Sequence, residues 1–226
     1  MNIQTFHSSS AGNLYRVSDI LIDPGVPIRQ IKKCLDYRLC DIKACLISHE
    51  HQDHIRGAKD LIRCGVDIYA SQGTADAALL SGHRVHTIEA GKQFHIGTWT
   101  ILPFATIHNA AEPLGFLLFS EFNGEKLIYA VDTQFIPYRF QGLTHIMIEA
   151  NYDIELLLNS ETRIEVKKNV LNYHMSIETA KEFLRTNDMS RVEEIHLLHL
   201  SNNNSDARQF IYEIQHITGR PVYIRG

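Results

Sequence analysis

The part of the sequence richest in reactive side chains is Ser48-His49-Glu50-His51-Gln52-Asp53-His54, where three imidazoles and Asp53 fall within six residues. It follows a predicted buried strand and precedes a predicted helix. Core packing does not explain this run, because each buried polar ring needs its own hydrogen-bond partner. Imidazole nitrogen and carboxylate oxygen are the usual ligands of zinc. The run therefore predicts a site for two adjacent metal ions, with His49 and His51 facing one ion and Asp53 and His54 facing the other.

A two-metal site needs further ligands from distant parts of the chain. His108, Asp132 and His199 each lie at or near the end of a predicted strand. Taken singly, each has an ordinary explanation, since a histidine at a strand end commonly lies on the surface and Asp132 suits a turn. Taken together, they supply the ligands that the run at 48–54 lacks.

Length and composition place the chain among folded proteins of one domain. It has 226 residues, of which 44% are hydrophobic and 21% charged, enough for one sizeable core and too apolar for disorder. We therefore expect a single domain over residues 1–226. No apolar run approaches the roughly 20 residues of a membrane span, and Met1–Phe6 shows no signal peptide, so the expected location is cytoplasmic.

The balance of charge bears on the substrate. Lysines and arginines number 22 and acidic residues 26, so the formal net charge is 22 − 26 = −4. Proteins that hold nucleic acid by charge alone are usually basic, because phosphate contacts supply most of the non-specific affinity. If this chain binds nucleic acid, bound metal must supply the positive charge.

The hydrophobic pattern predicts the architecture. Strands alternate with helices at both ends of the chain, and strands follow one another in the middle. The helices predicted from this pattern include Ile55–Arg63, Ile154–Asn159 and Ile177–Thr186. This order favours two sheets with helices outside them over a single doubly wound sheet.

The motif His49-x-His51-x-Asp53-His54, followed by His108, Asp132 and His199, resembles the metallo-β-lactamase superfamily. Leu21-Ile22-Asp23-Pro24-Gly25 matches an early aspartate motif of the same superfamily. The resemblance covers nearly the whole chain, in order. It implies an α+β fold, a four-layer αβ/βα sandwich, with two divalent metals, foremost zinc, with manganese or iron as alternatives.

The resemblance also implies a role for each ligand. His49, His51 and His108 would bind the first metal. Asp53, His54 and His199 would bind the second, and Asp132 would bridge the two. Asp23 would orient the ligands through hydrogen bonds rather than bind a metal itself.

Two further pairs of motifs reduce the number of reactions that this superfamily resemblance leaves open. Glu149-Ala150-Asn151 and His174-Met175-Ser176 resemble the paired motifs of ribonuclease Z-like phosphodiesterases, in which a Glu–His pair delivers a proton to the leaving alkoxide. Ser8–Asn13 and Leu198–Asn202 resemble the bacterial YycJ/WalJ-type nucleases.

These resemblances imply a metal-dependent phosphodiesterase, foremost a DNA exonuclease that attacks phosphorus with a hydroxide bridging the metals. Its catalytic residues would be Asp53, Glu149 and His174. The substrate would be nucleic acid, DNA before RNA, or a nucleotide, and no membrane partner is expected. The sequence leaves the metal, the cleavage polarity and any oligomer open.

Three other functions remain possible on the residues alone. A small-molecule phosphodiesterase acting on cyclic nucleotides would use the same metal site. A thioester hydrolase resembling glyoxalase II would not need Glu149 and His174, because a thiolate leaves without a proton. A binding module that uses metals only for stability would not need complete ligands for two ions.

Overall fold

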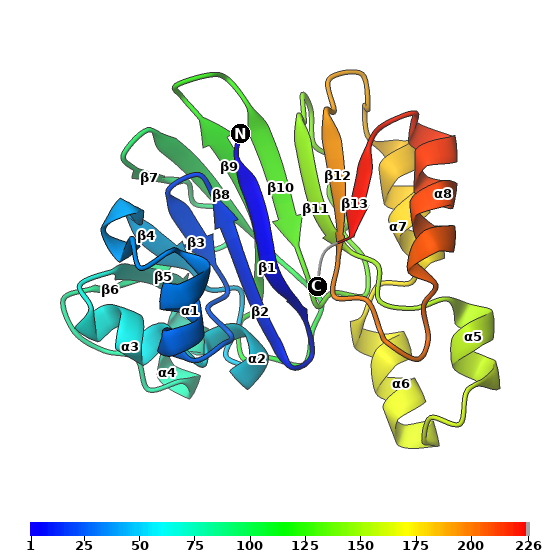
Figure 1. Ribbon diagram of the computed structural model, residues 1–226, viewed down its shortest axis with the longest axis horizontal. Coiled ribbons are helices and arrows are strands. Elements are labelled where there is room, and N and C mark those ends of the chain that lie inside the picture. The colour runs from blue at the N-terminus through cyan, green and yellow to red at the C-terminus, as the bar shows by residue number, and fades with distance from the viewer. Residues whose placement is uncertain (225–226) are drawn as a thin grey trace. The chain divides into compact units, whose positions relative to one another are not determined.

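The computed structural model describes residues 1–224, which form two compact units (Figure 1). Unit 1 comprises Met1–Ala105 and Ala110–Phe116, and unit 2 comprises Thr106–Asn109 and the chain from Leu117 onward. The strands form two sheets, one of six strands (β1 to β6) and one of seven (β7 to β13). This is the predicted α+β class. The single domain over residues 1–226 stays a prediction.

The strands are β1 (Ile3–Ser9), β2 (Gly12–Val17), β3 (Ile20–Ile22), β4 (Ala44–Leu46), β5 (Asp67–Ser71), β6 (Val85–Ile88), β7 (Phe94–Ile96), β8 (Trp99–Ala105), β9 (Leu114–Ser120), β10 (Lys126–Ala130), β11 (His145–Glu149), β12 (Glu194–Leu198) and β13 (Val222–Ile224). The α-helices are α1 (Ile28–Cys34), α2 (Gln52–Ile55), α3 (Ala58–Arg63), α4 (Gln72–Ala77), α5 (Ile154–Asn159), α6 (Ile164–Tyr173), α7 (Ile177–Thr186) and α8 (Ala207–Thr218).

In unit 1 the first sheet begins as a meander and continues as parallel strands. β1, β2 and β3 pair antiparallel, whereas β3 to β6 pair parallel. The parallel strands are joined by α1, α3 and α4, whose apolar side chains Ile31, Leu61 and Ala75 are buried in one cluster with strand residues such as Leu21 and Ile68. These helices cover one face of the parallel strands. Polar groups are therefore placed at the ends of the strands.

One predicted helix of unit 1 is broken in two. The sequence predicts a continuous helix over 55–63, but the structure has α2 and α3 with a break at Gly57. Gly57 N donates to Pro24 O at 2.7 Å, and a Cβ at this position would lie 2.5 Å from Ile31 Cδ1 and 2.7 Å from Val26 O. Because the segment after β3 passes so close to Gly57, α2 ends before this residue and α3 begins after it.

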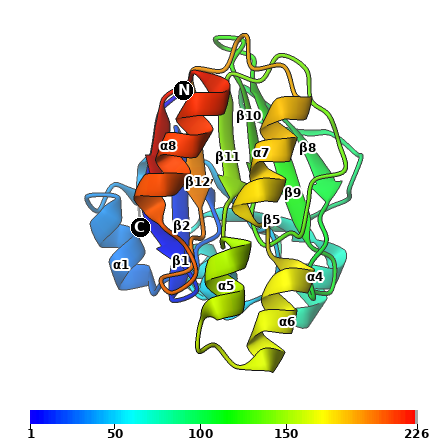
Figure 2. The same ribbon diagram turned by 90° about the vertical axis from the view of Figure 1, so that its right-hand side faces the viewer.

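In unit 2 the strands β10, β11, β12 and β13 pair parallel (Figure 1). α7 and α8 lie side by side on one face of these strands in both views (Figure 2), and they bury Phe183, Leu184, Phe210 and Ile214. α5 and α6 follow the carboxyl end of β11 and lie beyond the strands at that end in both views. Among the described residues, none of the helices combines the length and the apolar composition of a membrane span.

Candidate metal centre

The chemically reactive residues of each unit lie at the carboxyl ends of its parallel strands. In unit 1, Asp23 follows β3 and His49 follows β4. In unit 2, Asp132 follows β10, Glu149 ends β11 and His199 follows β12. Side chains at the carboxyl ends of neighbouring parallel strands meet at one edge of a sheet, which is where open α/β sheets bind their ligands.

In unit 1, Asp23 is a buried hydrogen-bond acceptor. Its side chain is fully buried and accepts from Ser48 N at 2.7 Å, from Ser48 Oγ at 2.7 Å and from His54 Nδ1 at 2.8 Å. These bonds fix the start of the histidine-rich loop. They also place the proton of His54 on Nδ1, so that Nε2 carries the lone pair that a metal ion needs.

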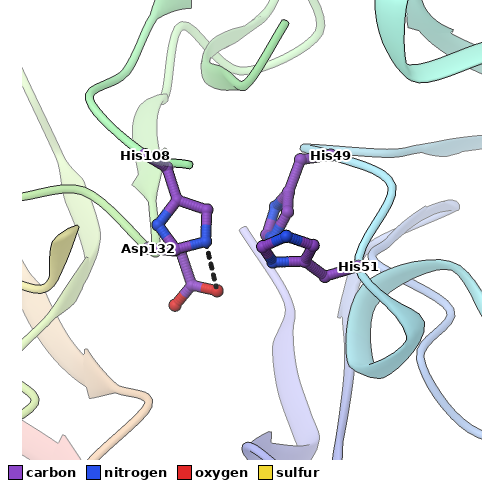
Figure 3. Close-up of side chains that lie close together, drawn as sticks. All are labelled: His49, His51, His108 and Asp132. Carbon is purple, nitrogen blue, oxygen red and sulfur yellow. Dashed lines mark ion pairs between the residues drawn. The ribbon is translucent and has the colours of Figure 1, made fainter. Parts of the chain in front are cut away.

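The imidazoles of this loop are packed tightly together. His49 Nδ1 lies 2.9 Å from Ser48 Oγ. The ring of His49 lies 4.6 Å from that of His51 (Figure 3) and 4.2 Å from that of His54, measured between centroids. Three imidazoles at this spacing, two of them held by their Nδ1 atoms, have the donor chemistry that divalent transition metals take.

Asp53 and His54 have a neighbour that the motif analysis did not identify. Asn13, which is fully buried at the start of β2, has its Nδ2 3.0 Å from His54 Nε2 and 3.2 Å from Asp53 O. Tyr15 Oη donates to Asn13 Oδ1 at 2.9 Å and holds the amide in place. Asn13 belongs to the Ser8–Asn13 motif, but that motif gave it no role beside Asp53 and His54.

Gly25 lies at a position where no side chain would fit. A Cβ at Gly25 would lie 1.6 Å from Asp53 O and 2.8 Å from Asn13 N. Only glycine allows the segment after β3 to pass so close to the histidine-rich loop. The Asp23-Pro24-Gly25 motif therefore supplies a hydrogen-bond acceptor and a contact surface for the loop.

In unit 2, Asp132 lies among three histidines. Its Oδ1 lies 2.8 Å from His199 Nδ1 and 3.5 Å from His174 Nδ1. Its Oδ2 lies 3.8 Å from His108 Nε2 (Figure 3). The last distance exceeds a hydrogen bond and suits two ligands of one ion. His108 Nδ1 lies 3.3 Å from Tyr173 O, so this ring donates from Nδ1 and turns Nε2 toward Asp132.

Glu149 and His174 form a buried pair. His174 Nδ1 lies 2.6 Å from Glu149 Oε1, and His199 Nδ1 lies 3.3 Å from the same oxygen. Glu149 Oε2 accepts from the backbone of Thr133 and Met175, each at 3.1 Å. The carboxylate is thus fixed on both oxygens, and it aligns the His174 ring, which keeps a side-chain exposure of 20%.

These contacts shift the pKa values of the pair. Burial by itself would lower the pKa of His174, but the charge of Glu149 and hydrogen bonds to Asp132 and Glu149 raise it to about 10. Burial would likewise raise the pKa of Glu149, but the charge of His174 and its hydrogen bonds lower it. The pair is an imidazolium held by a carboxylate.

The residues present fit divalent metal ions. Asp132, Glu149, His174 and His199 of unit 2 offer ligand atoms that all lie within 4.8 Å of one another. Unit 1 brings together His49, His51, Asp53 and His54, with Asp23 behind them. Imidazoles aligned by carboxylates and hydroxyls through the opposite ring nitrogen are typical of metal ligands.

Comparison with protein families identifies the fold. The model of the beta-lactamase superfamily domain matches residues 18–197, most of the chain. This chain belongs to the beta-lactamase superfamily. The metallo-beta-lactamase fold protein YhfI from Bacillus subtilis has a similar structure, with a TM-score of 0.72 at 15% identity over 99% of this chain and 95% of that chain. The predicted metallo-β-lactamase fold, with two mixed sheets and helices, is confirmed, as is the prediction of a superfamily hydrolase.

Relatives within the superfamily have names that specify a reaction. The chain is 28% identical to exodeoxyribonuclease WalJ of Streptococcus pneumoniae, over 93% of this chain and 84% of that protein. It is 25% identical to exodeoxyribonuclease YycJ of Bacillus anthracis, over 91% of this chain and 84% of that protein. The resemblance to YycJ/WalJ-type nucleases is therefore confirmed.

Proposed function

We propose that this protein is a phosphodiesterase that uses two divalent metal ions, and that it degrades DNA as an exonuclease. The observation that carries the proposal is the pair of Glu149 and His174 beside Asp132, because a phosphodiester alkoxide needs a proton to leave. The names of the two relatives support DNA as the substrate.

The proposed ligands are the seven side chains expected from the sequence. His49, His51 and His108 would hold one ion. Asp53, His54 and His199 would hold the other, and Asp132 would contact both. The ions would activate a water molecule and balance the charge that builds up on the phosphate oxygens. Zinc suits these nitrogen and oxygen ligands, and manganese or iron would also fit.

The chain's own groups perform the rest of the reaction. Asp23 and Ser48 hold His49 and His54 in the orientation for binding. Glu149 accepts a hydrogen bond from His174 Nδ1, which leaves Nε2 of the same ring to donate a proton to the departing oxygen. Asp53 is proposed both as a catalytic residue and as a metal ligand. Its Oδ2 lies 3.4 Å from His54 Nε2.

Cleavage of defined substrates tests this proposal. The purified chain with Zn²⁺ or Mn²⁺ should release mononucleotides from one end of end-labelled duplex or single-stranded DNA. Asp132→Ala should abolish the activity, whereas His83→Ala, a change at an exposed histidine, should not. Cleavage of DNA by Asp132→Ala at the wild-type rate would overturn the proposal.

The same panel separates the alternatives. Hydrolysis of cyclic nucleotides with no action on DNA would identify a small-molecule phosphodiesterase. Hydrolysis of a thioester such as S-lactoylglutathione, with no phosphodiesterase activity, would identify a glyoxalase II-like enzyme. Metal binding without any hydrolysis would identify a binding module. The cytoplasmic location and the preference for DNA over RNA stay predictions.

A further inference from the structure

The loop that follows Asp132 is held firmly at both ends. Thr133 Oγ1 accepts from Ile107 N at 3.0 Å and donates to Phe135 O at 2.9 Å. At the other end, Phe140 N donates to Asn187 Oδ1 at 2.8 Å, and Asn187 is held on α7 by its bond to Phe183 O. The residues between these anchors are therefore presented in a fixed geometry beside a proposed metal ligand.

This loop and α7 enclose a pocket of about 230 Å³ within unit 2. Its wall includes Phe135 and Tyr138, whose side chains stay 41% and 42% exposed. Arg139 supplies a cation, and Thr179 and Glu182 supply polar groups from α7. The pocket thus combines flat aromatic faces with a cation and with hydrogen-bonding groups at one wall.

We propose that this pocket binds an unpaired nucleobase of the DNA substrate, next to the nucleotide whose phosphate is cleaved. The inference rests on the proposed function. Aromatic rings bind bases of single strands by stacking, and a nearby arginine adds an attraction to the base and to its phosphate. Phe135 is three residues from Asp132, which limits the distance between their Cα atoms to about 11 Å. A base next to a phosphate at the proposed metal site would therefore be close enough to contact this loop.

The size and the charges of the pocket favour this occupant. Its volume is below the range of roughly 300–1,000 Å³ that takes whole drug-sized ligands, so it suits a single ring system rather than an intact cyclic nucleotide. An apolar helix from a partner protein would bury Arg139 and Glu182 without hydrogen bonds, at a cost. A base instead offers ring nitrogens and amino groups at its edge to these polar side chains.

The test combines a side-chain change with a change in the DNA. Kinetics are measured on a single-stranded oligonucleotide with Phe135→Ala, the conservative Phe135→Tyr, and the control Tyr212→Ala, which alters an exposed tyrosine on α8. With Phe135→Ala we expect KM for the oligonucleotide to rise by about 5- to 150-fold, the amount that one stacking contact contributes. Phe135→Tyr should restore KM, and Tyr212→Ala should match the wild type.

Oligonucleotides with one abasic site, moved stepwise from the cleaved end, identify the base concerned. Removing that base should raise KM for the wild type but hardly further for Phe135→Ala, because the two changes remove one contact. A purely structural role of Phe135 would instead give additive effects at every position. Additive effects, or an unchanged KM with Phe135→Ala, would overturn the inference.

A second measurement keeps the inference separate from the proposed function. If the wild type hydrolyses bis-(p-nitrophenyl) phosphate but no DNA, the proposed exonuclease function fails. The pocket is then tested by fluorescence anisotropy with a labelled single strand. Weaker binding by Phe135→Ala than by Tyr212→Ala would support a base pocket, and equal binding would overturn it.

Discussion

Three polar residues of the candidate centre hold backbone conformations that L-amino acids rarely adopt. Asp23, Asp132 and His199 have φ angles of 51°, 47° and 54°. Such left-handed conformations cost of order 1–3 kcal/mol each and persist where the surrounding structure enforces them. Each residue follows a parallel strand directly or nearly so, and the turn aims its side chain at the strand edge. We infer that these backbone conformations place the three side chains for binding, at the expense of stability.

The sequence alone offers candidate ligands for the site but not the contacts that hold them in place. Histidine and aspartate in the spacing of the run at 48–54 are rare outside metal sites, and strand ends identified the distant candidates. Asn13 and the carbonyl of Tyr173 could not be found in this way. Their roles depend on contacts between segments far apart in sequence, and a backbone carbonyl leaves no trace in side-chain identity.

Replacing His174 tests the proposed proton donor. His174→Ala should lower the rate of DNA cleavage by about 10²- to 10⁴-fold, the usual contribution of a general acid. The loss should be smaller on bis-(p-nitrophenyl) phosphate, whose phenolate leaves without a proton. Metal content, measured by elemental analysis, should stay at the wild-type level. Equal losses on both substrates would argue that His174 has a different role.

Asp23 offers a test of how the ligands are oriented. Asp23→Asn keeps the shape of the side chain but places an amide N–H where His54 Nδ1 donates. Zinc affinity should fall by about 10- to 100-fold, as is typical when a group that orients a ligand is lost. Calorimetric titration with Zn²⁺ would measure the loss. Wild-type affinity would show that His54 needs no such partner.

At the scale of elements, hydrophobic periodicity predicts the well-packed segments and fails where single contacts decide. The predicted helices at 154–159 and 177–186 coincide with α5 and α7, since each begins after a capping residue, Asp153 or Ser176, that accepts from the first backbone N–H groups. The strand β6 was not predicted, because its sequence Val-His-Thr-Ile has little apolar pattern. The break between α2 and α3 came from the close passage of another segment at Gly57.

Gly25 brings the segment after β3 into contact with the histidine-rich loop. Gly25→Ala would force a Cβ into Asp53 O, so the two segments must separate. We expect a loss of stability of about 1–3 kcal/mol or more, as for other overpacked sites, together with weaker metal binding. Gly219→Ala is the control, because Gly219 also resists substitution (φ 65°) but no atom lies within 4 Å of its added Cβ. Equal metal affinity in the two variants would contradict this account.

A partly buried contact between β8 and the turn before β3 makes the stability of the fold depend on pH. Asp19 accepts from Trp99 Nε1 at 2.7 Å and pairs with Lys43 at 2.8 Å. Burial opposes its ionisation, but the hydrogen bonds from Lys43 and Trp99 lower the pKa of Asp19 below its usual, unfolded-state value. The carboxylate therefore contributes stability above that unfolded-state value, and the contribution is lost as the pH falls through the lower, folded-state pKa.

Urea unfolding followed by fluorescence measures this contribution, because Trp99 is the single tryptophan of the chain. The difference in unfolding free energy between the wild type and Asp19→Asn should be present at pH 7 and shrink as the medium becomes acidic. The exposed change Glu161→Gln serves as a control. A difference between wild type and Asp19→Asn that grows toward low pH would refute the assignment.

For the whole molecule, the question is how an acidic chain would bind the polyanion proposed as its substrate. The formal charge of −4 would be balanced by two divalent ions, and the ions would place that positive charge at the strand ends rather than over the surface. Affinity for DNA should therefore depend on bound metal more than on surface lysines.

The fold class and the superfamily were predicted from the ligand motifs. The division into two compact units was not, since the apolar pattern shows no linker between them.

The central proposal is that the seven side chains expected from the sequence bind two divalent ions. Elemental analysis of protein purified without chelator and then reconstituted with Zn²⁺ tests it most directly. We predict about two equivalents for the wild type, and fewer for both His51→Ala in unit 1 and His108→Ala in unit 2. Less than one equivalent in the wild type, or undiminished binding in both variants, would contradict the account.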